Sequence, residues 1–203
     1  VGDSEDVAAR PKPLSTLVDG GISCATFFMG PSSGSKTALF QGEDEASHGM
    51  IGWVAEQIFS QLDEKRDLQS MGFYQNAVTI SFWEVYEEVI TDLLMPENRD
   101  LSISMNPAHG YTVNNITRPV VKSADELRAK LEYGRKSRKT QMFSTGPAAD
   151  SSGAIFEITL KQQEGDSQQS SVTTTCKLML IDVPSTHKLA EGAEKVRRQE
   201  GPT

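Results

Sequence analysis

The sequence predicts an α/β domain in which helices pack against a central β-sheet, and three observations support this fold class. Strand-like and helix-like segments alternate along the 203 residues, a length that suffices for one domain with a hydrophobic core. Residues 22–30, ISCATFFMG, form a continuous apolar run, which predicts a strand buried on both faces of a parallel or mixed sheet. A turn rich in glycine and serine follows this run and leads into a helical pattern.

The composition is ordinary for a globular protein. Hydrophobic residues make up 37% and charged residues 24%, and the net charge is −8, so the basic balance typical of nucleic-acid-binding proteins is absent. No apolar run reaches the roughly 18 residues that a membrane helix needs. We therefore expect neither a nucleic-acid partner nor a membrane partner. Cys24 and Cys176 lie in apolar, strand-like runs, where reduced and buried thiols are expected.

The elements of the first half follow from the residue patterns. Residues 1–12 are polar and are expected to form a disordered segment or linker. Residues 13–21 predict a helix that stops at its last two residues, both glycines, because glycine is typical of helix C-termini. After the glycine- and serine-rich turn, residues 36–42 turn helical. Residues 50–65 predict an amphipathic helix, since their apolar positions repeat with helical spacing.

The second half adds strands, a hairpin and a further helix. Residues 76–98 begin as a strand and are predicted to continue into a short helix that a proline stops. Residues 100–123 alternate in polarity and carry turn signals, which predicts a small hairpin. Residues 123–140 predict a helix capped by Ser123, and residues 153–183 predict two strands joined by a polar loop.

The turn after the first predicted strand has the composition of a phosphate-binding loop. Residues 29–42 read MGPSSGSKTALFQG, and in such loops backbone N–H groups wrap around phosphate oxygens. Lys36 would reach the β- and γ-phosphates, and Thr37 would bind Mg²⁺. Ser35 stands where the full pattern has glycine, so a plain turn between strand and helix is the alternative. The candidate nucleotide-binding residues of the loop are Gly30, Pro31, Ser32, Ser33, Gly34, Ser35, Lys36 and Thr37.

Further segments of the chain, taken in order, resemble the kinesin motor domain. After the loop come HGMIGWVAEQIF and VTISFWEVYEEVITDLL, the second of which is similar to the family pattern VSFLEIYNEEIxDLL. The next is HGYTVNNITRPVVKSADELRAKLEYGRKSRKT, which resembles GVYVxGLTEVPVxSxEExxxLLxxGxxxRxT. GAIFEITL and LMLIDVPSTHKL then resemble the segments around the family's switch I and switch II elements. Each motif is weak alone, but their shared order and spacing are specific.

This resemblance implies a kinesin-like P-loop NTPase fold with a central, mixed and mostly parallel β-sheet flanked by helices. It covers residues 13–203 and places switch I at residues 146–153 and switch II at residues 182–187. It implies ATP or ADP with Mg²⁺ as cofactor, bound by the loop of residues 30–37 together with Asp182, with Thr37 as the metal ligand. The family's first strand and its later microtubule-binding elements have no match here. The resemblance therefore implies a domain that is incomplete at both ends, with any coiled coil in flanking regions.

Both switch regions depart from the family pattern. The positions that differ from the family's catalytic residues are Ala149, Asp150, Ser151, Ser185 and His187. In the family, the switch I arginine and the switch II glutamate close the site around the attacking water, and here they are Ser151 and His187. The resemblance therefore implies that ATP hydrolysis is lost. The family's switch I histidine falls on Gly153. Aligning residues 151–152 with the family's serine pair instead needs a deletion and still lacks the arginine.

Two basic patches are candidates for contact with acidic tubulin. Residues 135–139 end a predicted helix, where a solvated helix end with favourably placed cations is the preferred alternative. Lys195, Arg197 and Arg198 fall in the loop that, in kinesins, joins switch II to the microtubule-binding helix. This second patch is the better microtubule-contact candidate.

The preferred interpretation is a kinesin-like domain that associates with microtubules without hydrolysing ATP, as a cytoskeletal scaffold or binding module. Its expected partners are tubulin and other cytoskeletal or axonemal proteins. Its expected location is the cytoplasmic cytoskeleton, including a cilium, axoneme or centriole. Two alternatives remain open: an active ATP-dependent microtubule motor with atypical switches, and an unrelated P-loop enzyme such as a small-molecule phosphotransferase.

Overall fold

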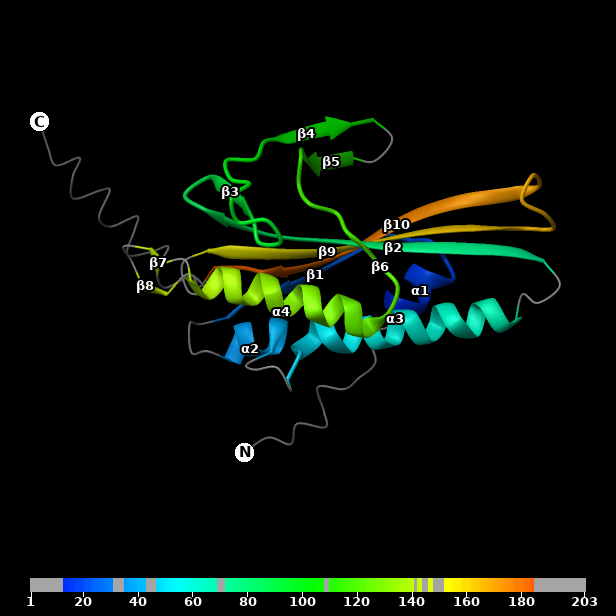
Figure 1. Ribbon diagram of the computed structural model, residues 1–203, viewed down its shortest axis with the longest axis horizontal. Coiled ribbons are helices and arrows are strands. Elements are labelled where there is room, and N and C mark those ends of the chain that lie inside the picture. The colour runs from blue at the N-terminus through cyan, green and yellow to red at the C-terminus, as the bar shows by residue number, and fades with distance from the viewer. Residues whose placement is uncertain are drawn as a thin grey trace, which may run out of the picture.

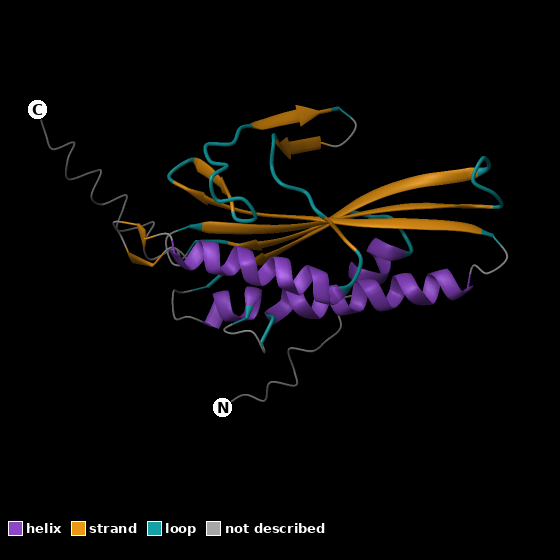
Figure 2. Ribbon diagram, in the orientation of Figure 1, coloured by secondary structure: helices purple, strands orange, loops and turns teal. Residues whose placement is uncertain are grey.

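The computed structural model describes residues 13–30, 35–42, 47–68, 72–107, 110–140, 142–143, 146–147 and 152–184. In this part of the chain, four helices lie on one face of a six-stranded sheet and a small hairpin lies over the opposite face (Figures 1 and 2). The helices coincide with predicted ones and are α1 (Pro13–Val18), α2 (Ser35–Gln41), α3 (Gly49–Leu68) and α4 (Ala124–Thr140). The strands are β1 (Cys24–Phe28), β2 (Phe73–Tyr86), β3 (Val89–Asp92), β4 (Ile103–Asn106), β5 (Gly110–Val113), β6 (Val120–Val121), β7 (Met142–Phe143), β8 (Gly146–Pro147), β9 (Gly153–Gly165) and β10 (Ser171–Asp182). None of the described helices is long and apolar enough to cross a membrane.

The main sheet has the strand order β1-β10-β9-β2-β3, with β6 paired to β2. The predicted mixed sheet with helices packed on it is confirmed. Within this sheet, only β1 and β10 run parallel, and the other four described pairs are antiparallel, so the described sheet is mixed but mostly antiparallel where mostly parallel pairing was expected. Parallel pairing is limited because the long hairpin of β9 and β10 fills the centre of the sheet, and a hairpin joins its strands antiparallel.

Alternate residues of the central strands face the helices and form the main core. The rings of Phe28, Phe40, Phe82 and Phe156 make a chain of contacts with successive centroid distances of 5.4, 6.4 and 5.3 Å. They come from β1, α2, β2 and β9, so this chain of rings packs the first turn-and-helix unit against the centre of the sheet. Edge-to-face and tilted arrangements of this kind add to the stabilisation that comes from burial alone.

Strand β1 differs from its prediction. Its middle residues are exposed, and Phe27 retains 59% exposure, whereas Phe28 is buried. All the described helices lie on the face opposite Phe27, so the prediction of burial on both faces is wrong for this strand. A continuous apolar run does not by itself distinguish one buried face from two. Cys24, also in β1, is partly exposed and Cys176 is buried, and neither is in a disulfide.

The segment after β2 is a hairpin rather than the predicted short helix. Glu87 and Glu88 have positive φ angles of 46° and 67°, which fits a tight two-residue turn between antiparallel strands. At the end of β3, the Asp92 Oδ1 accepts hydrogen bonds from the backbone N–H groups of Leu94 and Met95, at 2.9 and 3.2 Å. These bonds stabilise a turn where a helix was expected. The hairpin predicted next is confirmed as the antiparallel pair β4–β5.

Helix α4 is capped as predicted. The Glu126 N–H donates to Ser123 Oγ at 3.1 Å, and the Glu126 carboxylate accepts from the Lys122 N–H at 2.8 Å. Further along, Gly134 lies against Phe82, since an added Cβ would lie 2.4 Å from Phe82 Cδ1. Glycine therefore lets α4 approach β2 closely, and the last turns of α4 lie over the ends of the central strands (Figure 1).

Candidate nucleotide-binding site

The candidate site lies where the carboxyl ends of β1 and β10 meet the start of α2. Because β1 and β10 are parallel, Phe28 and Asp182 lie side by side. The Val183 N–H donates to the Phe28 carbonyl at 3.0 Å, which continues the pairing by one residue. Helix α2 begins at Ser35, so Lys36 and Thr37 lie in its first turn, close to Asp182.

Lys36 and Thr37 both contact the side chain of Asp182, which is fully buried. The Lys36 Nζ lies 3.1 Å from Asp182 Oδ1 in an ion pair, and it also donates a hydrogen bond to the Val183 carbonyl. The Thr37 hydroxyl donates to Asp182 Oδ2 at 3.3 Å. Oδ1 accepts no hydrogen bond from the described residues, so Lys36 balances it by charge alone. The fold thus brings together the ammonium, hydroxyl and carboxylate that the sequence assigns to phosphate and Mg²⁺ binding.

A second cation reaches the same carboxylate from α4. The Arg138 Nη1 donates to Asp182 Oδ2 at 3.0 Å. Its Nη2 donates to the Ser152 carbonyl at 3.0 Å and to the Ser152 hydroxyl at 3.4 Å. The Arg138 side chain is only 1% exposed. One guanidinium therefore joins the residue before β9 to the last residue of β10.

The basic run of residues 135–139 is divided between the interior and the surface. Arg135 is 3% exposed and Arg138 1% exposed, and Arg135 forms an ion pair with Glu132. Lys136, in contrast, is 64% exposed. For the two arginines, both a contact with a polyanion and a solvated helix end are therefore wrong, because this face of α4 packs against the sheet.

Glu84, near the end of β2, completes the buried cluster. Its Oε2 accepts a hydrogen bond from the Ser152 hydroxyl at 3.1 Å and lies 3.8 Å from the Arg138 Nε. Its Oε1 has no hydrogen-bond donor among the described residues. Burial raises the pKa of Glu84 above its ordinary value of 4.5, and the charge of Arg138 opposes that rise in part. With Lys36 and Asp182, the cluster contains two basic groups and two carboxyl groups.

The described end of the predicted switch I region lies directly beside the start of the predicted switch II region. Gly153, at the position of the family's histidine, begins β9, and an added Cβ there would lie 3.3 Å from Pro184 Cδ. Gly30 follows β1 and Ser35 begins α2. The other predicted site residues lie outside the described residues: Pro31, Ser32, Ser33, Gly34, Ala149, Asp150, Ser151, Ser185, His187, Lys195, Arg197 and Arg198.

Glu84, Arg138 and Ser152 are members of the cluster that sequence reasoning did not single out. A signal existed for each of them. Glu84 falls on the first glutamate of VSFLEIYNEE, and Arg138 falls on the arginine of GxxxRxT, so both coincide with fixed letters of the family patterns. Ser152 falls on the serine before the histidine of the family's switch I pattern NxxSSRSH, although its contacts depend on how β9 begins.

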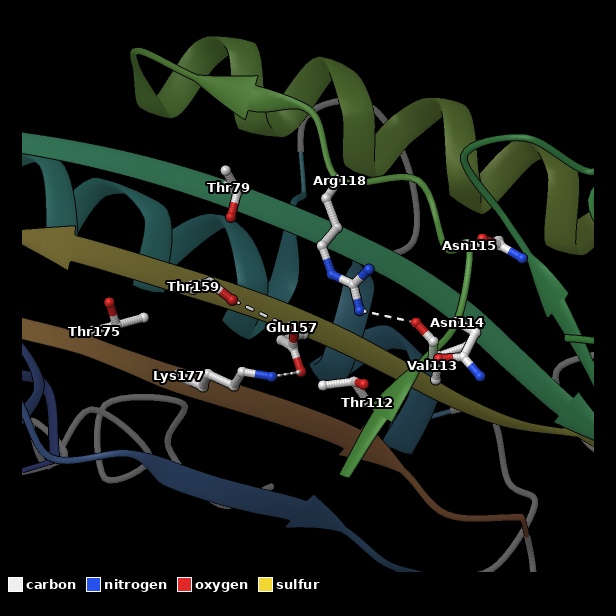
Figure 3. Close-up of a pocket in the computed structure, with 10 residues that line it drawn as sticks. All are labelled: Thr79, Thr112, Val113, Asn114, Asn115, Arg118, Glu157, Thr159, Thr175 and Lys177. Carbon is white, nitrogen blue, oxygen red and sulfur yellow. Dashed lines mark hydrogen bonds and ion pairs between the residues drawn. The ribbon is translucent and has the colours of Figure 1, made fainter. Parts of the chain in front are cut away.

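The opposite face of the sheet carries a separate polar groove of about 360 Å³, next to the β5 strand (Figure 3). Threonines 79, 159 and 175 come from three neighbouring strands of the sheet and line it. Within it, Lys177 forms an ion pair with Glu157 at 3.5 Å. Residues that alternate along a strand point to opposite faces, so this groove shares no side chain with the cluster at Asp182.

The fold and the site together place the chain in a class and then in a family. A strand, a glycine- and serine-rich turn and a helix beginning Ser-Lys-Thr, set beside a strand that ends in aspartate, are the parts of a P-loop fold. The family model described as the kinesin motor domain matches residues 3–203, and the chain belongs to this family. This match and the mixed sheet exclude the alternative of an unrelated P-loop enzyme.

Curated relatives match over most of this chain. The chain is 26% identical to kinesin-related protein 1 of Dictyostelium discoideum over 89% of its length, and covers 8% of that protein. It is 29% identical to kinesin-like protein KIF18B of Gallus gallus over 83% of its length, covering 20%, and 28% identical to the human chromosome-associated kinesin KIF4A over 93%, covering 15%. The chain therefore spans less than a quarter of each of these relatives.

A solved structure of a fast kinesin has the same fold. It aligns with a TM-score of 0.76 at 24% identity and covers 91% of this chain. The alignment includes 51% of the solved chain, so the present chain spans about half of that structure. The expected kinesin-like fold is thereby confirmed.

Proposed function

We propose that this chain is a kinesin-like, microtubule-associated domain that acts as a cytoskeletal scaffold or binding module without hydrolysing ATP. Family membership supports the association with microtubules. The single observation that supports the loss of hydrolysis is the replacement of the family's catalytic residues in both switch regions. Ser151 and His187 stand where the family has the arginine and glutamate that close the site around the attacking water. A serine and a histidine at these positions do not form the same ion pair, so the attacking water is left without its positioning groups.

The residues that are present fit a bound nucleotide better than they fit turnover. The ammonium of Lys36 suits phosphate oxygens, the Thr37 hydroxyl suits Mg²⁺, and both lie within 3.3 Å of the Asp182 carboxylate. If a Mg-nucleotide binds, Lys36 would pair with its phosphates, and the Thr37 hydroxyl would be a ligand of its Mg²⁺. We therefore propose binding of ATP or ADP with Mg²⁺ at loop 30–37, without turnover.

The proposed partners are tubulin in microtubules and other cytoskeletal or axonemal proteins, and the proposed location is the cytoplasmic cytoskeleton, including a cilium, axoneme or centriole. Lys195, Arg197 and Arg198 are the proposed tubulin-contacting residues, because cations favour the acidic surface of tubulin. Replacing these three residues by alanine should weaken co-sedimentation with microtubules. A matched control replaces three exposed lysines, Lys122, Lys130 and Lys161, and should leave co-sedimentation unchanged. Equal binding by both triple variants would contradict this assignment of the contact.

ATP turnover is the test of the central proposal. The full-length protein should show no phosphate release above background with or without microtubules, while it still sediments with them. Turnover that microtubules stimulate, that Lys36→Ala abolishes and that the exposed control Lys161→Ala leaves intact, would overturn the proposal.

That same result would establish the second candidate function, an active ATP-dependent motor with atypical switches. The observation that favours this alternative is the convergence of Lys36 and Thr37 on Asp182, since this part of the site is intact in geometry. Equilibrium binding of Mg-ATP tests whether the chain binds nucleotide at all, which both candidates require. If no nucleotide binds at high micromolar concentration, both the motor and the nucleotide-binding module are excluded, and only the microtubule-associated module remains.

A further inference from the structure

Arg138 has the geometry of a residue that holds two distant segments together. It lies on α4, yet its two Nη atoms donate to Asp182 at the end of β10 and to Ser152 just before β9. Ser152 lies in the predicted switch I region and Asp182 in the predicted switch II region, whereas Arg138 lies outside both regions and outside the loop. A forked guanidinium can fix two acceptors at once, which the single ammonium of a lysine does less well.

The local structure fixes Arg138 itself. Gly134, one turn earlier, allows α4 to lie against Phe82, and the Arg138 side chain is consequently 1% exposed. Its Nε lies 3.8 Å from Glu84 Oε2, and Glu84 in turn accepts a hydrogen bond from the Ser152 hydroxyl. Glu84 is thus placed as a second counter-ion, at the Nε of the guanidinium, while Asp182 lies at Nη1.

The Asp182 carboxylate is shared between this cluster and the phosphate loop. Oδ2 accepts hydrogen bonds from both Arg138 and Thr37, and Oδ1 faces Lys36 in the ion pair. A phosphate that draws Lys36 away would leave Asp182 without that cation. Arg138 would then be the remaining cation on the carboxylate, so it lowers the free energy needed to release Lys36.

We propose that Arg138 is a positioning residue of the candidate nucleotide site, which orients Asp182 towards Lys36 and Thr37 and keeps it paired when Lys36 binds phosphate. This inference rests on the proposed binding of a Mg-nucleotide at Lys36. It adds a link between the two switch regions that does not depend on the arginine and glutamate replaced by Ser151 and His187.

The test measures binding of the fluorescent nucleotide N-methylanthraniloyl-ADP with Mg²⁺ to the full-length protein. Arg138→Met is expected to weaken binding roughly tenfold to a hundredfold, the range for a lost hydrogen bond to a charged group. Arg138→Lys keeps the charge but not the fork and should fall between wild type and Arg138→Met. The matched control is Arg128→Met on the same helix, because Arg128 pairs only with surface carboxylates, Glu56 and Asp125, among the described residues. Control affinity should equal that of wild type.

Adding Glu84→Gln to Arg138→Met separates positioning from a purely structural role. The double variant removes the uncompensated carboxylate, so the thermal midpoint should recover relative to Arg138→Met while the nucleotide affinity stays low. If affinity recovers together with the thermal midpoint, Arg138 acts only as a counter-ion and the inference is overturned. If Arg138→Met does not fold, Arg138→Lys takes its place in the same comparison.

Failure of the inference and failure of the nucleotide site give different results. If wild type binds nucleotide, and both Arg138→Lys and Arg138→Met bind it as tightly as wild type does, the inference fails while the nucleotide site stands. If wild type itself binds no nucleotide, the nucleotide site fails, and hydrogen exchange decides whether Arg138 positions Asp182. Faster exchange at Gly153 and Val183 than at the core amides of β9 in Arg138→Lys supports positioning, and unchanged exchange overturns it.

Discussion

The two faces of the same sheet hold their charged groups in different ways. On the face that the helices cover, Arg138 and Asp182 form an ion pair in which the side chains are 1% and 0% exposed. On the opposite face, Lys177 and Glu157 form a pair in which they are 21% and 7% exposed. Strand β10 supplies one partner to each pair, Asp182 to the first and Lys177 to the second. The two pairs therefore have a strand in common and differ in their surroundings.

The difference lies in what remains when one partner is removed. Removing Arg138 would leave Asp182 and Glu84 buried beside the phosphate loop, where water cannot replace the lost charge. Removing Lys177 would leave Glu157, which is 7% exposed, lining a groove of about 360 Å³ that has room for water. On the helix-covered face, loss of the ion pair should therefore change both the stability of the fold and the geometry of the candidate site. On the opposite face, loss of the ion pair should leave the candidate site unchanged.

Replacement of Arg138 should give the largest effect. Arg138→Met is expected to lower the free energy of unfolding by about 3–5 kcal/mol, because it breaks a buried pair and leaves the buried Asp182 and Glu84 with Lys36 as the one remaining cation of the described cluster. Urea denaturation followed by circular dichroism measures this change. A loss below about 1 kcal/mol would mean that water reaches Asp182, and the contrast between the two faces would then not hold.

A smaller loss is expected where α4 contacts β2. Gly134→Ala places a Cβ 2.4 Å from Phe82 Cδ1, so the helix must move away from the sheet and is expected to lose about 1–3 kcal/mol of stability. The same denaturation experiment tests it, with Phe82→Leu added to remove the ring atom that clashes. If the leucine variant recovers none of the loss, Gly134 is needed for a reason other than this close approach.

The features of the fold and of the candidate site that were predictable from sequence are those that depend on residues close together in the chain. The helices, the Ser123 cap, and the loop lysine and threonine follow from local patterns, and the family resemblance added Asp182. The burial of Arg138 was not predictable from the local pattern, because it depends on Gly134 packing against a strand some fifty residues earlier, and a run of four cations otherwise indicates a surface. The turn at Glu87 and Glu88 was also missed, since glutamate rarely adopts positive φ.

The protonation of Glu84 should make the helix-covered face sensitive to pH. Burial raises its pKa, so between about 4.5, its value when unfolded, and its higher folded value the folded state binds more protons than the unfolded state. Stability from this group is fully present below pH 4.5 and is lost as the pH rises through the folded pKa. The stability of wild type minus that of Glu84→Gln should therefore fall as the pH rises from 4.5. A difference that grows over the same range would show that pairing with Arg138 outweighs burial.

Replacement of Lys177 should give the smallest effect. Lys177→Met replaces a cation by methionine, as Arg138→Met does, but on the opposite face of the sheet, and is expected to cost about 0–1 kcal/mol. Glu157 keeps its contact with the Thr159 hydroxyl at 3.4 Å and gains water in place of the ammonium. Whatever loss remains should shrink further in about 1 M salt, because salt screens exposed charges more than buried ones. A loss as large as that of Arg138→Met, unchanged by salt, would show that the groove is closed to water. The two faces would then differ only in which of them carries the phosphate loop.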